Sequence, residues 1–282
     1  MKIKKIYKEH YSGYVYNIGV ADNNNYYANN ILVHNCYANC TSSGQHAKLM
    51  NPDGTSAQYW ITTIPPYTEL AINGNDMDHP ELIPFLVYCK SHNIIVNITV
   101  HQKQFVNNYI MINKLQKDNL INGIGVSISD PDNTLISLMK NIKNVVCHVI
   151  AGIVTERELN ILANNGLNIL ILGYKEKGRG IAFHNIRPSY TFKLIDKLSE
   201  NILSYTDKFK AISFDCLAVK QLNMKDKLSD EEWDKLYMGE DGTTTFFINA
   251  VTEQFSKSST EINYIDINNK SVDEMFKIIT TK

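Results

Sequence analysis

The sequence predicts an α/β protein whose parallel sheet forms a six-strand, partial TIM-type (β/α)6 barrel, preceded by a small all-β hairpin. Between residues 59 and 220, short runs rich in Val, Ile and Leu alternate with longer segments of helical periodicity. This alternation is typical of parallel sheets, because each return to the sheet needs a crossover connection. The first 33 residues instead hold two extended runs separated by a turn-forming stretch at 22–25. Since pattern alone does not fix strand order, a doubly wound sheet is the alternative architecture.

The predicted elements follow one another regularly along the chain. Aliphatic and β-branched runs predict strands at residues 70–73, 94–100, 124–129, 145–154, 167–172 and 211–214. Apolar residues at helical spacing predict helices at residues 80–91, 107–118, 133–142, 156–164 and 190–201. From about residue 224 the pattern changes to a short helix and then a strand–turn–strand hairpin across residues 240–242. We therefore expect three regions: residues 1–35, a barrel region at 36–222 and a C-terminal cap at 223–282.

The charge balance and the cysteines limit the functional classes. The 282 residues include 28 Lys and Arg and 29 Asp and Glu, a net charge of −1, so nothing indicates a nucleic-acid or membrane surface. No apolar run reaches the roughly 18 residues of a transmembrane helix, and the basic N-terminus lacks the apolar core of a secretory signal. Three of the five cysteines (Cys89, Cys147 and Cys216) lie in apolar runs. We therefore expect reduced, buried thiols and a cytoplasmic protein.

The junction His34–Asn35–Cys36 contains three residue types with complementary chemistry. The Asn35 side-chain amide can attack its own backbone carbonyl and form a succinimide, which cleaves the chain after Asn35. His34 can donate a proton to the departing amine, and Cys36 is a nucleophile for an incoming acyl thioester. These roles need these residue types in this order. An ordinary hairpin with an incidental His-Asn-Cys sequence is the alternative.

The stretch VYNIGVADNNNYYANNILVHNC, which closes on this junction, resembles the last two conserved blocks of inteins. The resemblance implies that residues 1–35 are the C-terminal fragment of a split intein and that the three junction residues are catalytic. Because no N-terminal intein half precedes them, we expect splicing in trans. A partner polypeptide would supply the N-terminal split-intein fragment and the upstream extein. Asn17 and Asn24 depart from the pattern, since inteins often carry Asp and His at these positions.

Cys36 also begins a second motif, CYANCTSSGQHA. Cys36 and Cys40 have the spacing that opens a Cys-x3-Cys-x2-Cys iron–sulfur motif, but the next required position is Ser43, so that interpretation fails. In radical S-adenosylmethionine (SAM) proteins, the last motif cysteine is commonly followed by Tyr and a short polar loop, as Cys36 is by Tyr37. The stretch resembles this loop in phage-type radical SAM proteins. The two earlier cysteines would then lie on the upstream extein, and Cys40 would be a bystander.

This resemblance implies a 4Fe–4S cluster and SAM as cofactors, with the partial barrel as the fold. Three thiolates, one of them from Cys36, would hold the cluster. Its open iron would bind the SAM amino and carboxylate groups, and reductive cleavage of SAM would give a 5′-deoxyadenosyl radical. Tyr37, next to this ligand, is a candidate cofactor-binding residue. The substrate and the reaction are not predicted.

Further candidate SAM contacts lie at predicted strand ends, where ligands of parallel α/β sheets bind. The segment Asn73-Gly74-Asn75-Asp76 resembles the stretch after the second barrel strand whose backbone contacts the SAM amino group. It has Asn75 and Asp76 where Glu-Pro is usual, and a simple strand-to-helix turn is the alternative. His79-Pro80 is predicted to start the following helix.

Two other strand ends carry polar residues. Ser127 or Ser129 could bond the SAM ribose or carboxylate. Lys175 lies in the segment LILGYKEKGRG, where glycines and basic residues could hold a phosphate or carboxylate; a basic loop without a ligand is the alternative. Three histidines are interpreted as hydrogen-bonded structural residues: His46, His101 and His148.

The leading hypothesis is a precursor that splices in trans at Asn35/Cys36 to give a radical SAM enzyme. The unspliced chain would be structurally complete in its barrel but would lack a working site, because it supplies one of three cluster thiolates. Two alternatives remain open: a non-catalytic α/β binding module, and an inactive fragment of an interrupted gene.

Overall fold

The computed structural model describes residues 46–75, 77, 79–176, 180–181 and 188–281, with backbone only at 74, 75 and 188. It also describes the backbones of three N-terminal strands, β1 (Asn17–Val20), β2 (Tyr26–Ala28) and β3 (Ile31–Val33). Six further strands form the body of the sheet: β4 (Glu69–Asn75), β5 (Ile95–His101), β6 (Gly123–Ser127), β7 (Val145–Ile150), β8 (Asn168–Leu172) and β9 (Ala211–Phe214). The helices named below are α1 (Tyr59–Thr62), α2 (Leu82–Ser91), α3 (Gln102–Asn107), α4 (Tyr109–Lys117), α5 (Asn133–Lys140), α6 (Glu156–Leu162), α8 (Pro188–Asn201), α9 (Cys216–Gln221), α10 (Asp230–Leu236) and α11 (Val272–Thr281).

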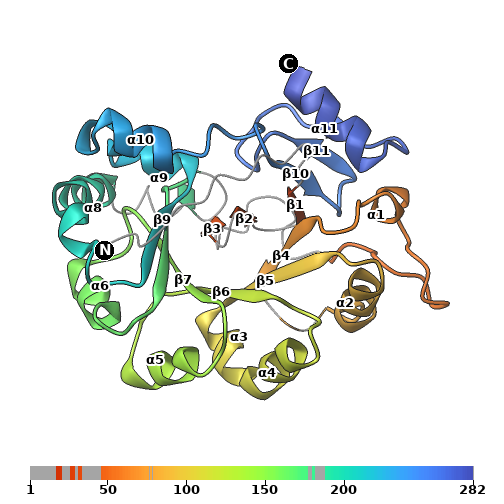
Figure 1. Ribbon diagram of the computed structural model, residues 1–282, viewed down its shortest axis with the longest axis horizontal. Helices are drawn as coiled ribbons and strands as arrows, with labels where there is room; N and C mark the ends of the chain where they lie inside the picture. Colours follow the sequence, from red (N-terminus) through yellow and green to blue (C-terminus); the bar gives the residue numbers. More distant parts are fainter. Residues whose placement is uncertain are drawn as a thin grey trace.

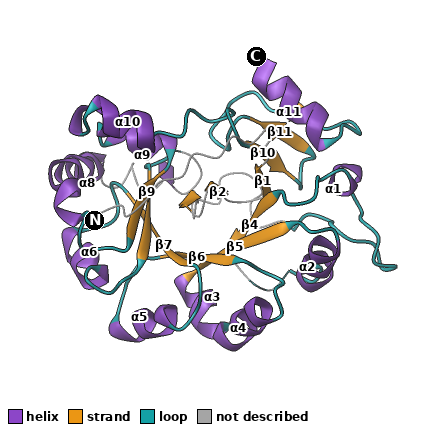
Figure 2. Cartoon of the chain, in the orientation of Figure 1, coloured by secondary structure: helices purple, strands orange, loops and turns teal. Residues whose placement is uncertain are grey.

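Strands β4 to β9 are parallel and lie side by side in sequence order. The sheet is curved, and the connecting helices lie along its outer side (Figure 1). Figure 2 shows the same separation by secondary structure, with helices outside and strands inside. The α/β class and the parallel sheet are therefore confirmed. The unbroken strand order is compatible with a partial α/β barrel, and differs from a doubly wound sheet, whose order reverses at its switch point.

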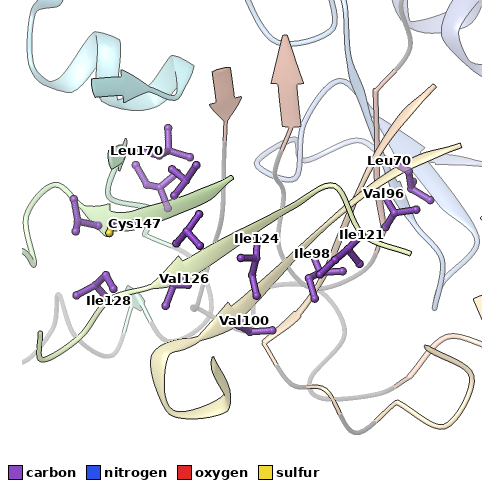
Figure 3. Packing of buried hydrophobic residues seen from close by; sticks show 14 of the residues in the cluster. Leu70, Val96, Ile98, Val100, Ile121, Ile124, Val126, Ile128, Cys147 and Leu170 are labelled. Atoms are coloured by element: carbon purple, nitrogen blue, oxygen red, sulfur yellow. The ribbon is translucent and has the colours of Figure 1, made fainter. Parts of the chain in front are cut away.

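The convex face of the sheet is apolar and packs against the helices. It presents every second residue of each strand; Figure 3 shows Leu70, Val96, Ile98, Val100, Ile124, Val126 and Cys147 among them. The Cys147 thiol lies 3.7 Å from the Met139 sulfur on α5, which fixes this face as the helix-covered one. Within the described part of the chain, no helix is long and apolar enough to cross a membrane.

The C-terminal region differs from its prediction. The chain forms β10 (Phe246–Asn249) and β11 (Gln254–Ser256) as an antiparallel pair, with β12 (Ile265–Asp266) beside β11. The turn predicted at residues 240–242 is present, since the Thr243 N–H donates a 3.1 Å hydrogen bond to the Glu240 carbonyl oxygen, but the hairpin predicted across it is wrong, because the hairpin turns after Asn249. The Asn249 side-chain oxygen accepts hydrogen bonds from the backbone N–H groups of Val251 and Thr252, at 3.0 and 3.2 Å, which stabilises that turn. Helix α11, which the sequence analysis did not predict, follows it.

The N-terminal strands do not pair as predicted. Strands β2 and β3 form an antiparallel pair, whereas β1 is parallel to both β4 and β10 and lies between them in the ten-stranded sheet. The predicted pairing of residues 14–20 with residues 26–33 in a separate hairpin is thus not seen. Strand β2 contacts β4, and β3 contacts β9, at the two ends of the six-strand body. The β2–β3 pair accordingly lies inside the curve of the sheet (Figure 1).

Candidate functional site

The concave face of the sheet, which we call the inner face, carries polar and small residues on β4 to β6, where the convex face carries aliphatic ones; on β7 and β8 it is largely aliphatic, with His148 and Asn168 as its polar residues. The register aligns Asn73 on β4 with Thr99 on β5 and Gly125 on β6, and aligns Ser127 on β6 with His148 on β7. The polar residues among them are all buried. Parallel strands covered on both faces are usually apolar throughout. A polar stripe across three or four of them therefore marks the face of the sheet that is best suited to a polar ligand.

His148 is the most unusual residue of the inner face. Its side chain is 1% exposed, and both ring nitrogens lack a hydrogen-bond partner among the described residues, as does the Thr99 hydroxyl. Burial lowers the pKa of His148 to about 3, so the ring is neutral. A Cβ on Gly125 would lie 2.2 Å from His148 Cε1 and 2.8 Å from Thr99 Oγ1. The missing side chain at Gly125 therefore makes room for the imidazole beside Thr99.

The predicted contact at the end of β4 coincides with a β-bulge. Asn73 pairs with Thr99 and Asn75 pairs with Val100, so Gly74 is the extra residue that lies outside the regular register. A bulge frees backbone groups from the ladder, and bulges are frequent beside active sites. The backbone at Gly74 is thus in a form suited to contact a ligand, while Asp76 lies outside the described residues.

His101 closes β5 and caps the next helix. Its Nδ1 accepts a hydrogen bond of 3.2 Å from the backbone N–H of Lys103, and its Nε2 lies 3.2 Å from the Ser129 hydroxyl. Burial, assisted by the nearby Lys103 charge, lowers the pKa of His101. The interpretation of His101 as a hydrogen-bonded structural residue is confirmed. Ser129 is engaged by this histidine at the rim, whereas Ser127 is buried on the inner face.

Lys175 lies after β8, near a buried carboxylate at the end of β9. Its ammonium is 3.4 Å from the Ser259 hydroxyl of the C-terminal region. The nearby Asp215 caps α9, accepting hydrogen bonds from the backbone N–H groups of Ala218 at 2.6 Å and Gly173 at 2.8 Å. Burial raises the pKa of Asp215, against the opposing effects of the Lys175 charge and these two donors. Lys175 is therefore part of a polar cluster at the carboxyl edge of the sheet.

The chain that follows the Cys36 loop is anchored to the β4–α2 connection. One Glu81 carboxylate oxygen accepts hydrogen bonds from the backbone N–H groups of Leu49 and Met50, at 2.6 and 2.9 Å. His79 Nε2 lies 2.9 Å from the Ala47 carbonyl oxygen, and its ring stacks on His46 with a centroid distance of 4.6 Å. These contacts hold residues 46–50 against the loop that begins at the β4 bulge.

Helix α2 begins at Leu82, with Glu81 as N-cap, and not at His79-Pro80 as predicted. The His79 ring accepts a 3.0 Å hydrogen bond from the Glu81 backbone N–H, so residues 79–81 form a tight turn before the helix. The two side chains are consequently free of the helix and turned towards residues 46–50. Sequence reasoning assigned these residues only to the helix start.

The splicing and cluster candidates His34, Asn35, Cys36 and Tyr37 lie outside the described residues, as does Cys40. Among the residues that are described, no group of three or more His, Cys, Asp or Glu could hold a metal ion. Cys89 and Cys147 are buried, and burial raises the pKa of each thiol to about 12, as expected of core cysteines. Cys216 is only partly buried, with its thiol 3.7 Å from the Gly239 carbonyl oxygen.

The interpretation of His148 as a hydrogen-bonded structural residue is wrong, because neither ring nitrogen has a partner among the described residues. Sequence reasoning also missed the roles of Thr99, His79 and Glu81. A signal for His148 and Thr99 was present, because Asn97, Thr99 and the closing histidine of β5 alternate with Val96, Ile98 and Val100. In a strand expected to be covered on both faces, period-two polarity indicates that one face lines a lumen. Nothing local marks the other two, because their partners at residues 47–50 lie more than 30 positions earlier in the chain.

Comparison with known proteins identifies no relative: no family model, no curated protein and no solved structure gives a significant match to this chain.

Proposed function

We propose that the chain is the precursor of a radical SAM enzyme and that it is completed by protein trans-splicing. Residues 1–35 act as the C-terminal fragment of a split intein. Asn35 cyclises with His34 as proton donor, and Cys36 accepts the upstream extein. In the ligated product, Cys36 and two cysteines of that extein hold a 4Fe–4S cluster.

The observation that carries the proposal is the anchoring of residues 46–50 by His79 and Glu81. It ties the chain that leaves Cys36 to the loop after β4, at the carboxyl edge of the parallel strands, where ligands of such sheets bind. The β4 bulge lies at this edge. Because few residues separate Cys36 from this anchored segment, a thiolate at Cys36 would lie within reach of this edge of the sheet.

The described residues fit a polar ligand with amino, carboxylate and hydroxyl groups. The Gly74 backbone at the bulge would contact an amino group, and Ser127 and Lys175 would hold a carboxylate or a ribose. His148 and Thr99 bring buried polar atoms without a partner among the described residues, which a ligand would satisfy. The bound cluster and SAM would supply electron transfer and radical chemistry; these residues would bind and orient the cofactor and exclude water from it.

Mixing the chain with its partner polypeptide tests the splicing half. Intact-mass spectrometry should show release of a 35-residue peptide ending in a succinimide, and a ligated product joined at Cys36. Asn35→Ala should block release. The splicing half is wrong if the wild-type chain gives neither the peptide nor the ligated product.

Iron and sulfide analysis of the spliced product, after anaerobic reconstitution, tests the enzyme half. We expect four irons per chain, and the same content in Cys40→Ala. A content that collapses in Cys40→Ala would instead support the α/β binding module with a metal held by Cys36 and Cys40. Absence of iron from the wild-type spliced product would refute the cluster.

A further inference from the structure

Residues 17–20 occupy an internal position of the main sheet. Strand β1 is parallel to β4, from Asn17 opposite Glu69 to Val20 opposite Ile72. On its other side it is parallel to β10, with Ile18 opposite Phe246 and Val20 opposite Ile248. Strands β4 and β10 are not neighbours of each other in the sheet. Among the described strands, β1 is therefore the one that pairs with both the C-terminal strands and the six-strand body of the sheet.

Under the proposed function, this strand is removed when residues 1–35 are excised. Its departure would leave β4 and β10 about 10 Å apart, since neighbouring strands are about 4.8 Å apart. The backbone groups that faced β1 would then lose their partners. In the precursor, with β1 in place, these groups lie in a buried environment, where Leu70, Ala71 and Ile248 are 0% exposed. Unpaired backbone groups in such a place are strongly destabilising, so the product needs another strand in the same position.

We propose that the upstream extein supplies that strand, and that β1 holds its place in the precursor. Ligation joins the extein directly to Cys36, so this segment is covalently delivered to the site. A strand parallel to β4 ends at the carboxyl edge of the sheet, the edge that carries the β4 bulge. From there, residues 36–45 can span up to about 35 Å, which is ample to reach the anchored segment at residues 46–50.

The sheet also specifies the chemistry of the incoming strand. The positions that Ile18 and Val20 occupy lie opposite Leu70 and Ile72 on β4, and opposite Phe246 and Ile248 on β10. Phe246 packs near Phe276 of α11, with ring centroids 6.0 Å apart, so this face of the strands is covered. We therefore expect aliphatic or β-branched residues at alternate positions of the extein strand, at least two of them.

Three products distinguish this inference from the proposed function itself. The first is the normally spliced chain. The second is released by a partner whose N-terminal splicing nucleophile is replaced by alanine, so that Asn35 cleavage proceeds without ligation. The third is spliced to an altered upstream extein of the same length. This extein keeps its cluster cysteines and its splice junction, and all its other residues are replaced by Gly and Ser.

Hydrogen–deuterium exchange of peptides covering β4 and β10 gives the readout, and peptides covering β7 and β8 give the internal control. Relative to the spliced chain, the second and third products should exchange at least tenfold faster in β4 and β10 and at the same rate in β7 and β8. Equal protection of β4 and β10 in all three products would overturn the inference while leaving splicing intact. Failure to obtain a ligated product would overturn both.

The precursor provides a further check that does not depend on splicing. Ile18→Pro removes a backbone donor from the middle of the sheet, whereas Ile18→Ala keeps it. We expect the proline variant to exchange at least tenfold faster in β4 and β10 than the alanine variant. Equal protection in the two variants would show that β1 does not hold the position, and would remove the basis of the inference.

Discussion

Replacing Glu81 by alanine removes the carboxylate that holds the chain downstream of Cys36. One oxygen of Glu81 accepts two backbone hydrogen bonds, from Leu49 and Met50, whose side chains are buried in the core. Hydrogen bonds to charged groups contribute about 1.5–3 kcal/mol each. Because Glu81 is only partly buried, we take the lower end and expect Glu81→Ala to lose about 3 kcal/mol of the free energy of unfolding.

Urea denaturation of the full chain measures this loss, with an unchanged m-value as evidence that the unfolded state is the same. Glu231→Ala is the matched control, because Glu231 forms an exposed i,i+4 ion pair with Lys235. Such pairs contribute about 0.5 kcal/mol or less. If Glu81→Ala were no less stable than this control, the anchor would contribute nothing and the main support for the proposed site would be lost.

The pH dependence provides an independent test of the same contact. Burial raises the pKa of Glu81, but the hydrogen bonds from Met50 and Leu49 and the charges of His79 and Lys48 outweigh it, and the net pKa is lowered. A lowered pKa means that the stabilisation is fully present above the unfolded-state value of about 4.3. It is lost as pH falls through the folded-state pKa. The stability difference between the wild-type chain and Glu81→Gln should therefore shrink below about pH 4.

Three other substitutions test the inner face and its rim. Burial lowers the pKa of His148 to about 3. The free energy of unfolding of the wild-type chain should therefore fall by up to about 1.4 kcal/mol per pH unit as the pH drops from about 6.5 towards 3. Urea titrations of His148→Gln should lack this contribution to the pH dependence. Gly125→Ala should lower the free energy of unfolding by about 1–3 kcal/mol, because the new methyl group clashes with the His148 imidazole. In a double-mutant cycle, Gly125→Ala/His148→Ala should recover most of this loss. Strictly additive losses would contradict the position of His148 beside Gly125. Asp215→Ala should lower the free energy of unfolding by about 2–4 kcal/mol. The control is Asp132→Ala at the N-cap of α5, where the carboxylate accepts one hydrogen bond, at 2.7 Å, and the expected loss is about 1 kcal/mol. Equal losses in thermal melts would show that the hydrogen bond from Gly173 to Asp215 contributes nothing.

Local pattern was sufficient for the six central strands. Their aliphatic runs, such as residues 95–100 and 168–172, are long enough to be read without knowledge of their neighbours, and their parallel pairing follows from the helices between them. The boundaries shifted where a side chain bonds the backbone. Thus α2 starts after the turn made by His79 and Glu81, a feature that no periodicity reports.

The mispredicted elements depend on which of two nearby turns forms the hairpin, or on pairing partners that are distant in the sequence. Gly242 has a positive φ of 87° and suggested a hairpin turn, but the Asx turn at Asn249 places the hairpin later. Strand β1 pairs with residues 69–72 on one side and 246–248 on the other. Pairings between segments so far apart in the sequence depend on which strands of the folded sheet still have unpaired edges. The residues of a short extended run carry no information about this.

The position of β1 changes what the unspliced chain is expected to be. The sequence places the barrel within residues 36–222, yet the sheet includes β1 between β4 and β10, and the β2–β3 pair contacts β4 and β9 inside its curve. The segment proposed for excision therefore contributes to the sheet and also lies across the inner face. Under the proposed function, the event that brings in two cluster cysteines also exchanges this strand and clears that face. Splicing would then complete the ligand set and the sheet through the bond made at Cys36, and clear the inner face through the bond broken after Asn35.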